Sequence, residues 1–172
     1  MRRRYCAAAA LTATVLLTGT GATCGTASGA QLPATRSVAV STAQLPTEQQ
    51  IAALFDKWNA ALATGDPNRV ADLYAPDAVL LPTVSDIRTS RAGIVDYFTK
   101  FLASKPVGKI QERFITVLDR TSAVDTGLYQ FTLTDKNGGK STVDARYTFV
   151  YELRGGRWLI LNHHSSVLPS PG

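Results

Sequence analysis

Apolar residues recur along this chain with two different spacings, one typical of helices and the other of β-strands. Before Pro106 they recur every three or four positions, and after it they alternate with polar residues. The helical spacing predicts three amphipathic helices, over residues 47–64, 67–74 and 90–102. The alternation predicts long strands over 109–118, 123–134, 142–154 and 157–167, and a short apolar strand is expected at 78–81.

Local signals set the ends of the predicted helices. Thr47 and Gln50 have the spacing of a capping box, so the first helix should begin directly after Thr47. Gly65-Asp66-Pro67 ends this helix and starts the second one. A turn is expected at Ala75-Pro76-Asp77, and Ser90 or Thr89 can cap the third helix.

The predicted strands are joined by short connections with turn-forming residues, at 119–122, 137–139 and 155–156. Connections this short make successive strands antiparallel neighbours. The helices come first and the meander of strands second. The chain is therefore expected to form an α+β domain, in which three helices close one face of a strongly twisted, mostly antiparallel sheet.

The last hairpin can be paired residue by residue, because its Gly155-Gly156 loop has two residues. This register pairs Leu153 with Trp158, Tyr151 with Ile160, Phe149 with Asn162 and Tyr147 with His164. These side chains are expected to face the helices, so that His164 points inwards and His163 outwards. A β-bulge in either strand would exchange parts of the assignment.

The opposite face of this hairpin mixes charged and aliphatic side chains. It is expected to carry Arg146 together with Val150, Leu159 and Leu161. Aliphatic side chains left facing water on a sheet are typical of a subunit interface. The sequence therefore predicts self-association through this face.

The N-terminal 30 residues have the pattern of a secretory signal peptide. Three arginines at 2–4 precede an apolar stretch at 7–17, and small residues follow as far as Ala30. Cleavage is expected after Ala30, with Ala22 as an alternative. A retained membrane anchor and a lipoprotein attached through Cys24 are the other interpretations. We therefore expect an exported protein, extracellular or associated with the cell envelope, with no stable membrane insertion once the signal is removed.

Removal of this segment changes the composition of what remains. The chain has 18 basic and 13 acidic residues, and three of the basic ones lie in residues 1–30, which leaves 15 against 13. A net charge of +2 is no basic footprint, so nucleic acid is not an expected partner. Cys6 and Cys24 are the two cysteines of the chain and both lie in the signal, which excludes disulfide, thiol and cysteine–metal chemistry afterwards. Residues 31–45 read as a flexible lead, 46–168 as the domain and 169–172 as a tail.

Several short motifs together resemble a known family. They are Trp58-Asn59-Ala60-Ala61-Leu62 with Gly65-Asp66, Tyr74-Ala75-Pro76-Asp77-Ala78, Tyr97-Phe98, Ala145 to Val150, Gly156-Arg157-Trp158-Leu159 and His163 to Ser166. From Ile51 onward the chain resembles the nuclear transport factor two-like superfamily, whose fold is a cone of three helices wrapped by a curved sheet. More closely, it is similar to the association (hub) domain of calcium/calmodulin-dependent protein kinase II.

The resemblance implies an oligomerisation module that dimerises through its sheet and assembles dimers into rings, with a polar, arginine-bearing pocket in each cone. Arg146 matches a hub arginine, whereas Tyr129 stands where the hub has another arginine. This departure weakens the expectation of anion binding. The chain has no kinase domain and no calmodulin-binding basic helix.

The candidate ligand-binding residues are Trp58, Tyr97, Tyr129, Arg146 and His164. The three aromatic residues could line a pocket or belong to the core. Arg146 needs an acceptor, either a carboxylate of this chain such as Asp125 or Asp144 or the anionic end of a ligand. His164 could bind a ligand, act as a general acid or base, or be structural.

Other chemistries lack support in the sequence. His163 and His164 are neighbours on a strand and point to opposite faces, so they cannot bind one metal ion together. No glycine-rich dinucleotide motif follows a strand, and we expect no cofactor.

Two functions remain as hypotheses. The first is an exported homo-oligomer, a dimer or larger ring, that binds an unknown small polar or anionic molecule in its cone. The alternative is an isomerase, a dehydratase or a polyketide-tailoring enzyme of the same fold. In that enzyme His164 would be the acid/base, with Tyr129 and Arg146 orienting the substrate.

Overall fold

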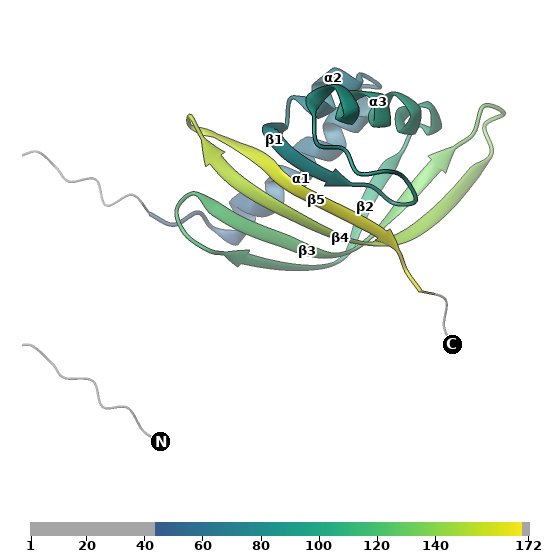
Figure 1. The fold of residues 1–172 in the computed structure, drawn as a ribbon. Helices are drawn as coiled ribbons and strands as arrows, with labels where there is room; N and C mark the ends of the chain where they lie inside the picture. The colour runs from purple at the N-terminus through teal and green to yellow at the C-terminus, as the bar shows by residue number, and fades with distance from the viewer. Residues whose placement is uncertain (1–43, 170–172) are drawn as a thin grey trace, which may run out of the picture. The chain divides into compact units, whose positions relative to one another are not determined.

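Three α-helices and a five-stranded sheet make up residues 44–169 of the computed structural model, which are the residues the structure describes (Figure 1). In chain order the elements are α1 (Glu48–Ala63), α2 (Pro67–Ala71), β1 (Tyr74–Leu81), α3 (Arg91–Phe101), a 3₁₀ turn (Leu102–Ser104), β2 (Val107–Val117), β3 (Ser122–Thr134), β4 (Lys140–Arg154) and β5 (Arg157–Val167). The α+β fold is confirmed. The signal peptide predicted for residues 1–30 and most of the lead lie outside the described residues.

The helix starts follow the predicted caps. The Thr47 side chain accepts from the Gln50 backbone N–H at 3.2 Å, and the Gln50 side chain accepts from the Thr47 N–H at 2.8 Å. Ser90, rather than Thr89, caps α3 by accepting from the Gly93 N–H at 3.2 Å. These reciprocal bonds satisfy N–H groups that the helix itself leaves without acceptors.

The turn predicted at Ala75-Pro76-Asp77 is wrong, because these residues belong to β1. The second helix ends at Ala71, and the chain continues directly into β1, which pairs in parallel with β5. The sheet order is β1-β5-β4-β3-β2, so β1 is an edge strand. Proline is tolerated there because one side of an edge strand needs no backbone N–H donor.

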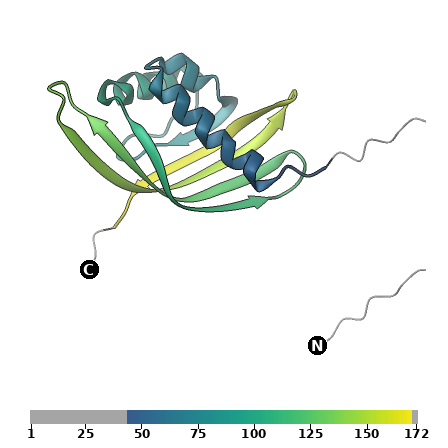
Figure 2. The same cartoon turned by 180° about the vertical axis from the view of Figure 1, so that it is seen from behind.

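The sheet bends strongly, and the helices lie on its concave side (Figure 2). In β2 the pairing with β3 shifts between Ile110 and Glu112. Gly127 of β3 lies at this irregularity, and a Cβ on it would lie 2.0 Å from the Glu112 carbonyl oxygen. The bend therefore depends on a close backbone approach that only glycine permits.

A second irregularity decides which side chains of β5 face the helices. Leu153 pairs with Trp158 and Tyr151 with Ile160, as the two-residue loop predicts, but the pairing then shifts between Val150 and Tyr151. The expected pairs of Phe149 with Asn162 and Tyr147 with His164 are wrong. Phe149 pairs with His163 and Tyr147 with Ser165. His163 is consequently buried on the concave side, and His164 is exposed on the outer face.

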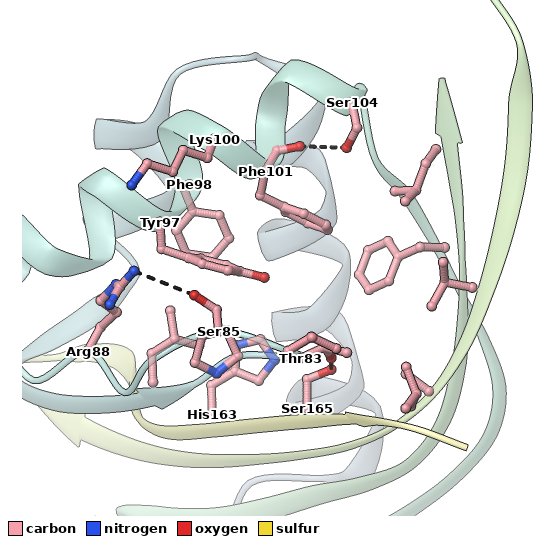
Figure 3. A pocket seen from close by; sticks show the side chains of 18 of the residues that line it. Thr83, Ser85, Arg88, Tyr97, Phe98, Lys100, Phe101, Ser104, His163 and Ser165 are labelled. Carbon is pink, nitrogen blue, oxygen red and sulfur yellow. Dashed lines mark hydrogen bonds between the residues drawn. The ribbon is translucent and has the colours of Figure 1, made fainter. Parts of the chain in front are cut away.

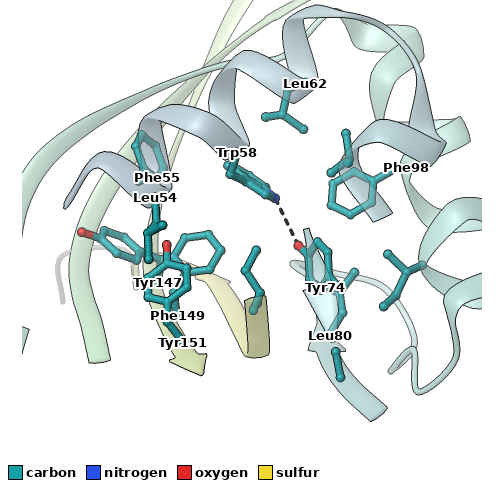
Figure 4. Close-up of a cluster of buried hydrophobic side chains, with 14 of the residues drawn as sticks. Leu54, Phe55, Trp58, Leu62, Tyr74, Leu80, Phe98, Tyr147, Phe149 and Tyr151 are labelled. Carbon is teal, nitrogen blue, oxygen red and sulfur yellow. Dashed lines mark hydrogen bonds between the residues drawn. The ribbon is translucent and has the colours of Figure 1, made fainter. Parts of the chain in front are cut away.

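The core fills the space between α1 and the concave face (Figure 4). The buried side chains that α1 contributes are Ile51, Leu54, Phe55, Trp58 and Leu62. Trp58 contacts Phe98 and Phe149 in edge-to-face geometry, with centroids 6.3 and 5.4 Å apart. Aromatic pairs at such distances add to the stabilisation from apolar burial.

Candidate functional site

A cavity of about 740 Å³ lies between α3, the loop after β1 and the concave face of the sheet (Figure 3). Most of its wall is apolar and aromatic, formed by Trp58, Leu80, Phe98, Phe101, Phe131 and Leu133. A polar group of Thr83, Tyr129, His163 and Ser165 lines the side formed by the sheet and the end of β1. A large apolar cavity with a few convergent polar groups is the usual form of a small-molecule site.

His163 is held in one tautomer by its neighbours. Its Nδ1 lies 2.8 Å from the Tyr74 hydroxyl, which also accepts a hydrogen bond from Trp58 Nε1 at 3.2 Å. The indole can only donate, so the arrangement that uses every proton has Tyr74 donating to Nδ1. The ring then carries its proton on Nε2, which is buried and has no partner among the described residues.

Burial also keeps this imidazole uncharged. His163 is 4% exposed and stacks on Phe149 with the ring centroids 4.1 Å apart. Burial, with a smaller effect of the neighbouring His164, lowers the pKa of His163 to about 3. At neutral pH the ring is therefore a neutral hydrogen-bonding group.

Three hydroxyl groups from distant parts of the chain form a hydrogen-bonded chain beside His163. Tyr129 of β3 donates to Ser165 of β5 at 2.5 Å, and Ser165 lies 2.5 Å from the hydroxyl of Thr83, which follows β1. Three hydroxyl protons serve two hydrogen bonds, so one proton on Ser165 or Thr83 stays available. Burial raises the pKa of Tyr129 well above its ordinary value, so all three groups are uncharged at neutral pH.

The charges around the cavity lie at its rim and balance one another. Arg88 is 3.9 Å from Asp86 and 3.7 Å from Asp96, and Lys100 is 3.0 Å from Asp96. Tyr97 lies nearby, and burial raises its pKa to about 12 although Arg88 acts to lower it. The rim thus has two cations and two carboxylates, with no net charge.

The predicted site residues separate into two groups. Trp58, Tyr97 and Tyr129 line the cavity together, whereas Arg146 and His164 lie on the outer face of the sheet. The prediction that His164 faces the cone is wrong, because the shift in β4–β5 pairing turns it outwards. His164 therefore cannot be the acid/base of a reaction inside the cone.

Arg146 and His164 line a shallow depression of about 460 Å³ on the outer face, beside Glu112, Phe114 and Ser166. The carboxylates expected to pair with Arg146 have other partners. Asp144 accepts from the Gln130 amide at 2.8 Å, and Asp125 lies on the concave side.

Asp125 belongs to a separate buried polar group. It is fully buried, accepts from the Tyr147 hydroxyl at 2.9 Å and lies 3.2 Å from Arg113 Nε. Burial raises the pKa of Asp125, although Tyr147 and Arg113 both act to lower it. Arg113 also lies over the Phe55 ring, 5.5 Å from its centroid. Neither Asp125 nor Arg113 lines the cavity.

Sequence reasoning missed His163, Ser165 and Thr83 as cavity residues. The alternation along β5 contained the first two, but their face depended on the position of a bulge. No local signal brings Thr83 to them, since it is 82 residues from Ser165 in the chain.

Two general searches add to this picture. None of the helices within residues 44–169 has the length and hydrophobicity that crossing a membrane would demand. Over the same residues no three His, Cys, Asp or Glu side chains gather as metal ligands would.

A bent sheet wrapped around helices and an internal cavity define the nuclear transport factor 2-like class of folds. A Salmonella enterica protein of that superfamily has a TM-score of 0.64, with 18% identity over 72% of this chain and 92% of the other. The sequence model of the calcium/calmodulin-dependent protein kinase II association domain matches residues 47–169. The chain belongs to this association-domain family.

Solved structures of two association domains are similar to it. A Xanthomonas campestris protein assigned as such a domain is 63% identical, with a TM-score of 0.71, over 75% of this chain and 95% of the other. The association domain of the Caenorhabditis elegans kinase has a TM-score of 0.57 at 13% identity, over 69% and 94%. No curated protein matches the chain significantly.

Proposed function

We propose that this protein is an exported, self-associating domain that binds a small organic molecule in its cone. The observation that carries the binding function is the cavity. It combines an aromatic wall with an inner polar group in which hydroxyl and imidazole protons have no partner among the described residues. Its volume of about 740 Å³ falls within the range of small-molecule sites.

Self-association is supported by the family and by the outer face of the sheet. The family is named for association. On that face Phe114 is 59% exposed, next to the depression that holds Arg146 and His164. Leu159 and Leu161 are only half-buried at the same end of the sheet. An exposed aromatic side chain at the centre of a sheet face is typical of an interface anchor.

Native mass spectrometry of the protein, purified without denaturation, tests both parts. We expect a dimer or larger ring and a reproducible additional mass for each subunit. An empty protein that also binds no added small molecule would contradict the binding function, and a monomer would contradict self-association.

A charge on the outer face gives a sharper test of assembly. Phe114→Asp should dissociate the oligomer, because a carboxylate would lose its hydration in an apolar interface. Leu45→Asp is the matched control, since Leu45 is 58% exposed but precedes α1. The proposed interface is wrong if the mass of the Phe114 variant in solution stays that of the parent protein.

Export is tested by the intact mass of the protein recovered outside the cytoplasm of an expressing cell. Loss of residues 1–30 is the expected result, and retention of the full chain would contradict it.

A further inference from the structure

The charge distribution of the cavity indicates which ligands it can hold. We propose that the cone binds an uncharged, largely apolar ring compound whose carbonyl oxygen accepts a hydrogen bond from the Tyr129–Ser165–Thr83 hydroxyl chain. This inference rests on the proposed function, because it names the ligand class of the same cavity.

The hydroxyl chain supplies the donor. Tyr129 uses its proton on Ser165, and the Ser165–Thr83 pair uses one of its two protons within the pair. The remaining proton can be donated to a carbonyl oxygen in the cavity. Thr83 is only partly buried, so a ligand can reach the end of this chain.

An uncharged oxygen fits this end of the cavity better than a carboxylate. The polar groups here are hydroxyls and the neutral ring of His163, and none of them is a cation. Arg113, the nearest arginine of the interior, is paired with Asp125 and does not line the cavity. A carboxylate would lose its hydration without gaining a counter-ion.

The rim does not reverse this preference. Arg88 and Lys100 already lie close to Asp86 and Asp96, and an anionic ligand would meet both signs of charge. These ion pairs would have to break before Arg88 could bind a ligand carboxylate. An uncharged ligand leaves them in place.

The rest of the wall selects an apolar ring system. Phe98 and Phe101 from α3 face Phe131 of β3 across the cavity, and Phe101 meets Phe131 edge-to-face with centroids 5.4 Å apart. Flat rings can stack on or meet the edges of such side chains. Figure 3 shows Tyr97, Phe98 and Phe101 on the helix side and His163 and Ser165 on the opposite side.

Three probes of equal size test this assignment by isothermal titration calorimetry. They are 2-acetonaphthone, which has a neutral carbonyl, 2-naphthoate, which has a carboxylate, and 2-ethylnaphthalene, which has no acceptor. We expect the ketone to bind the parent protein at least about tenfold more tightly than either of the others, a difference of about 1.4 kcal/mol.

A variant without the hydroxyl chain tests the anchor. The triple substitution Tyr129→Phe, Ser165→Ala and Thr83→Val removes donors and acceptors together, which leaves the fold intact when the shapes are similar. We expect it to lower the affinity for the ketone to that for the hydrocarbon. Ser104→Ala is the control, since Ser104 lines the same cavity but donates to the Phe101 carbonyl at 2.7 Å.

The outcomes separate this inference from the proposed function. If 2-naphthoate or 2-ethylnaphthalene binds the parent as tightly as the ketone, the cavity binds small molecules but the ligand class is wrong. An unchanged ketone affinity in the folded triple variant would overturn the hydroxyl anchor. If no probe binds and native mass spectrometry finds no retained molecule, both proposals fail. Should the triple variant not fold, the ranking of the three probes on the parent protein still decides the ligand class.

Discussion

Acid should destabilise this protein well before its carboxylates become protonated, and His163 is the reason. Its pKa is about 3 in the folded protein because of burial, against 6.5 for an ordinary histidine. As the pH falls below 6.5, the unfolded chain takes up a proton that the folded chain refuses. The stability that the neutral ring allows is therefore complete above pH 6.5 and declines from there down to about pH 3.

The size of the effect follows from linkage. Each pH unit within this window costs about 1.4 kcal/mol of unfolding free energy, so ~2 kcal/mol should be lost between pH 7 and pH 5. Asp125 acts in the opposite direction, because its raised pKa lets the folded state bind a proton first. This contribution is shared by a parent protein and its histidine variants, so it cancels in their comparison.

The assay is urea denaturation of three proteins at pH 7, 6 and 5. His163→Gln keeps an acceptor for the Tyr74 hydroxyl but cannot titrate, so its unfolding free energy should lose ~2 kcal/mol less than that of the parent over this range. His164→Gln is the matched control, because His164 is the other histidine of the chain and is exposed on the outer face. The reasoning fails if the His163 variant keeps the parent's pH dependence, or if the His164 variant loses it.

Three further substitutions test the fold by urea denaturation at pH 7. Gly127→Ala should cost about 3 kcal/mol, because its Cβ would overlap the Glu112 carbonyl; a loss below 1 kcal/mol would show that the bend can relax. Thr47→Ala should cost about 1 kcal/mol by removing the α1 cap, and no loss would mean that the capping bonds contribute nothing. Asp125→Ala should cost about 3 kcal/mol by leaving Arg113 without its partner; adding Arg113→Met should restore part of this, and a purely additive double variant would contradict the pairing.

Much of the fold could be predicted because its signals are local. The Thr47 capping box, the glycine turn at 155–156 and the alternation along the last four strands each depend on residues close in the chain. These signals located α1 and α3 and the long strands to within a few residues. The second helix was predicted too long, because apolar residues after Ala71 fit a helical period as well as they fit the start of β1.

The site could be predicted only in part. Trp58, Tyr97 and Tyr129 were found because aromatic side chains on the apolar face of an element must point into the interior wherever that element packs. Arg146 and His164 were expected at the ligand site and lie on the other face of the sheet. Thr83 carried no signal at all.

The sequence by itself therefore determined the elements, their order and the family, since propensity, capping and periodicity act over a few residues. Tertiary structure alone decided the parallel pairing of β1 with β5 and the side of the sheet on which each histidine lies. The reason is the two-residue period of a strand, since one extra residue at the shift beyond Tyr151 reverses the face of every position after it. That shift places His163 and Ser165 beside Tyr129 in the cavity and leaves His164 in water.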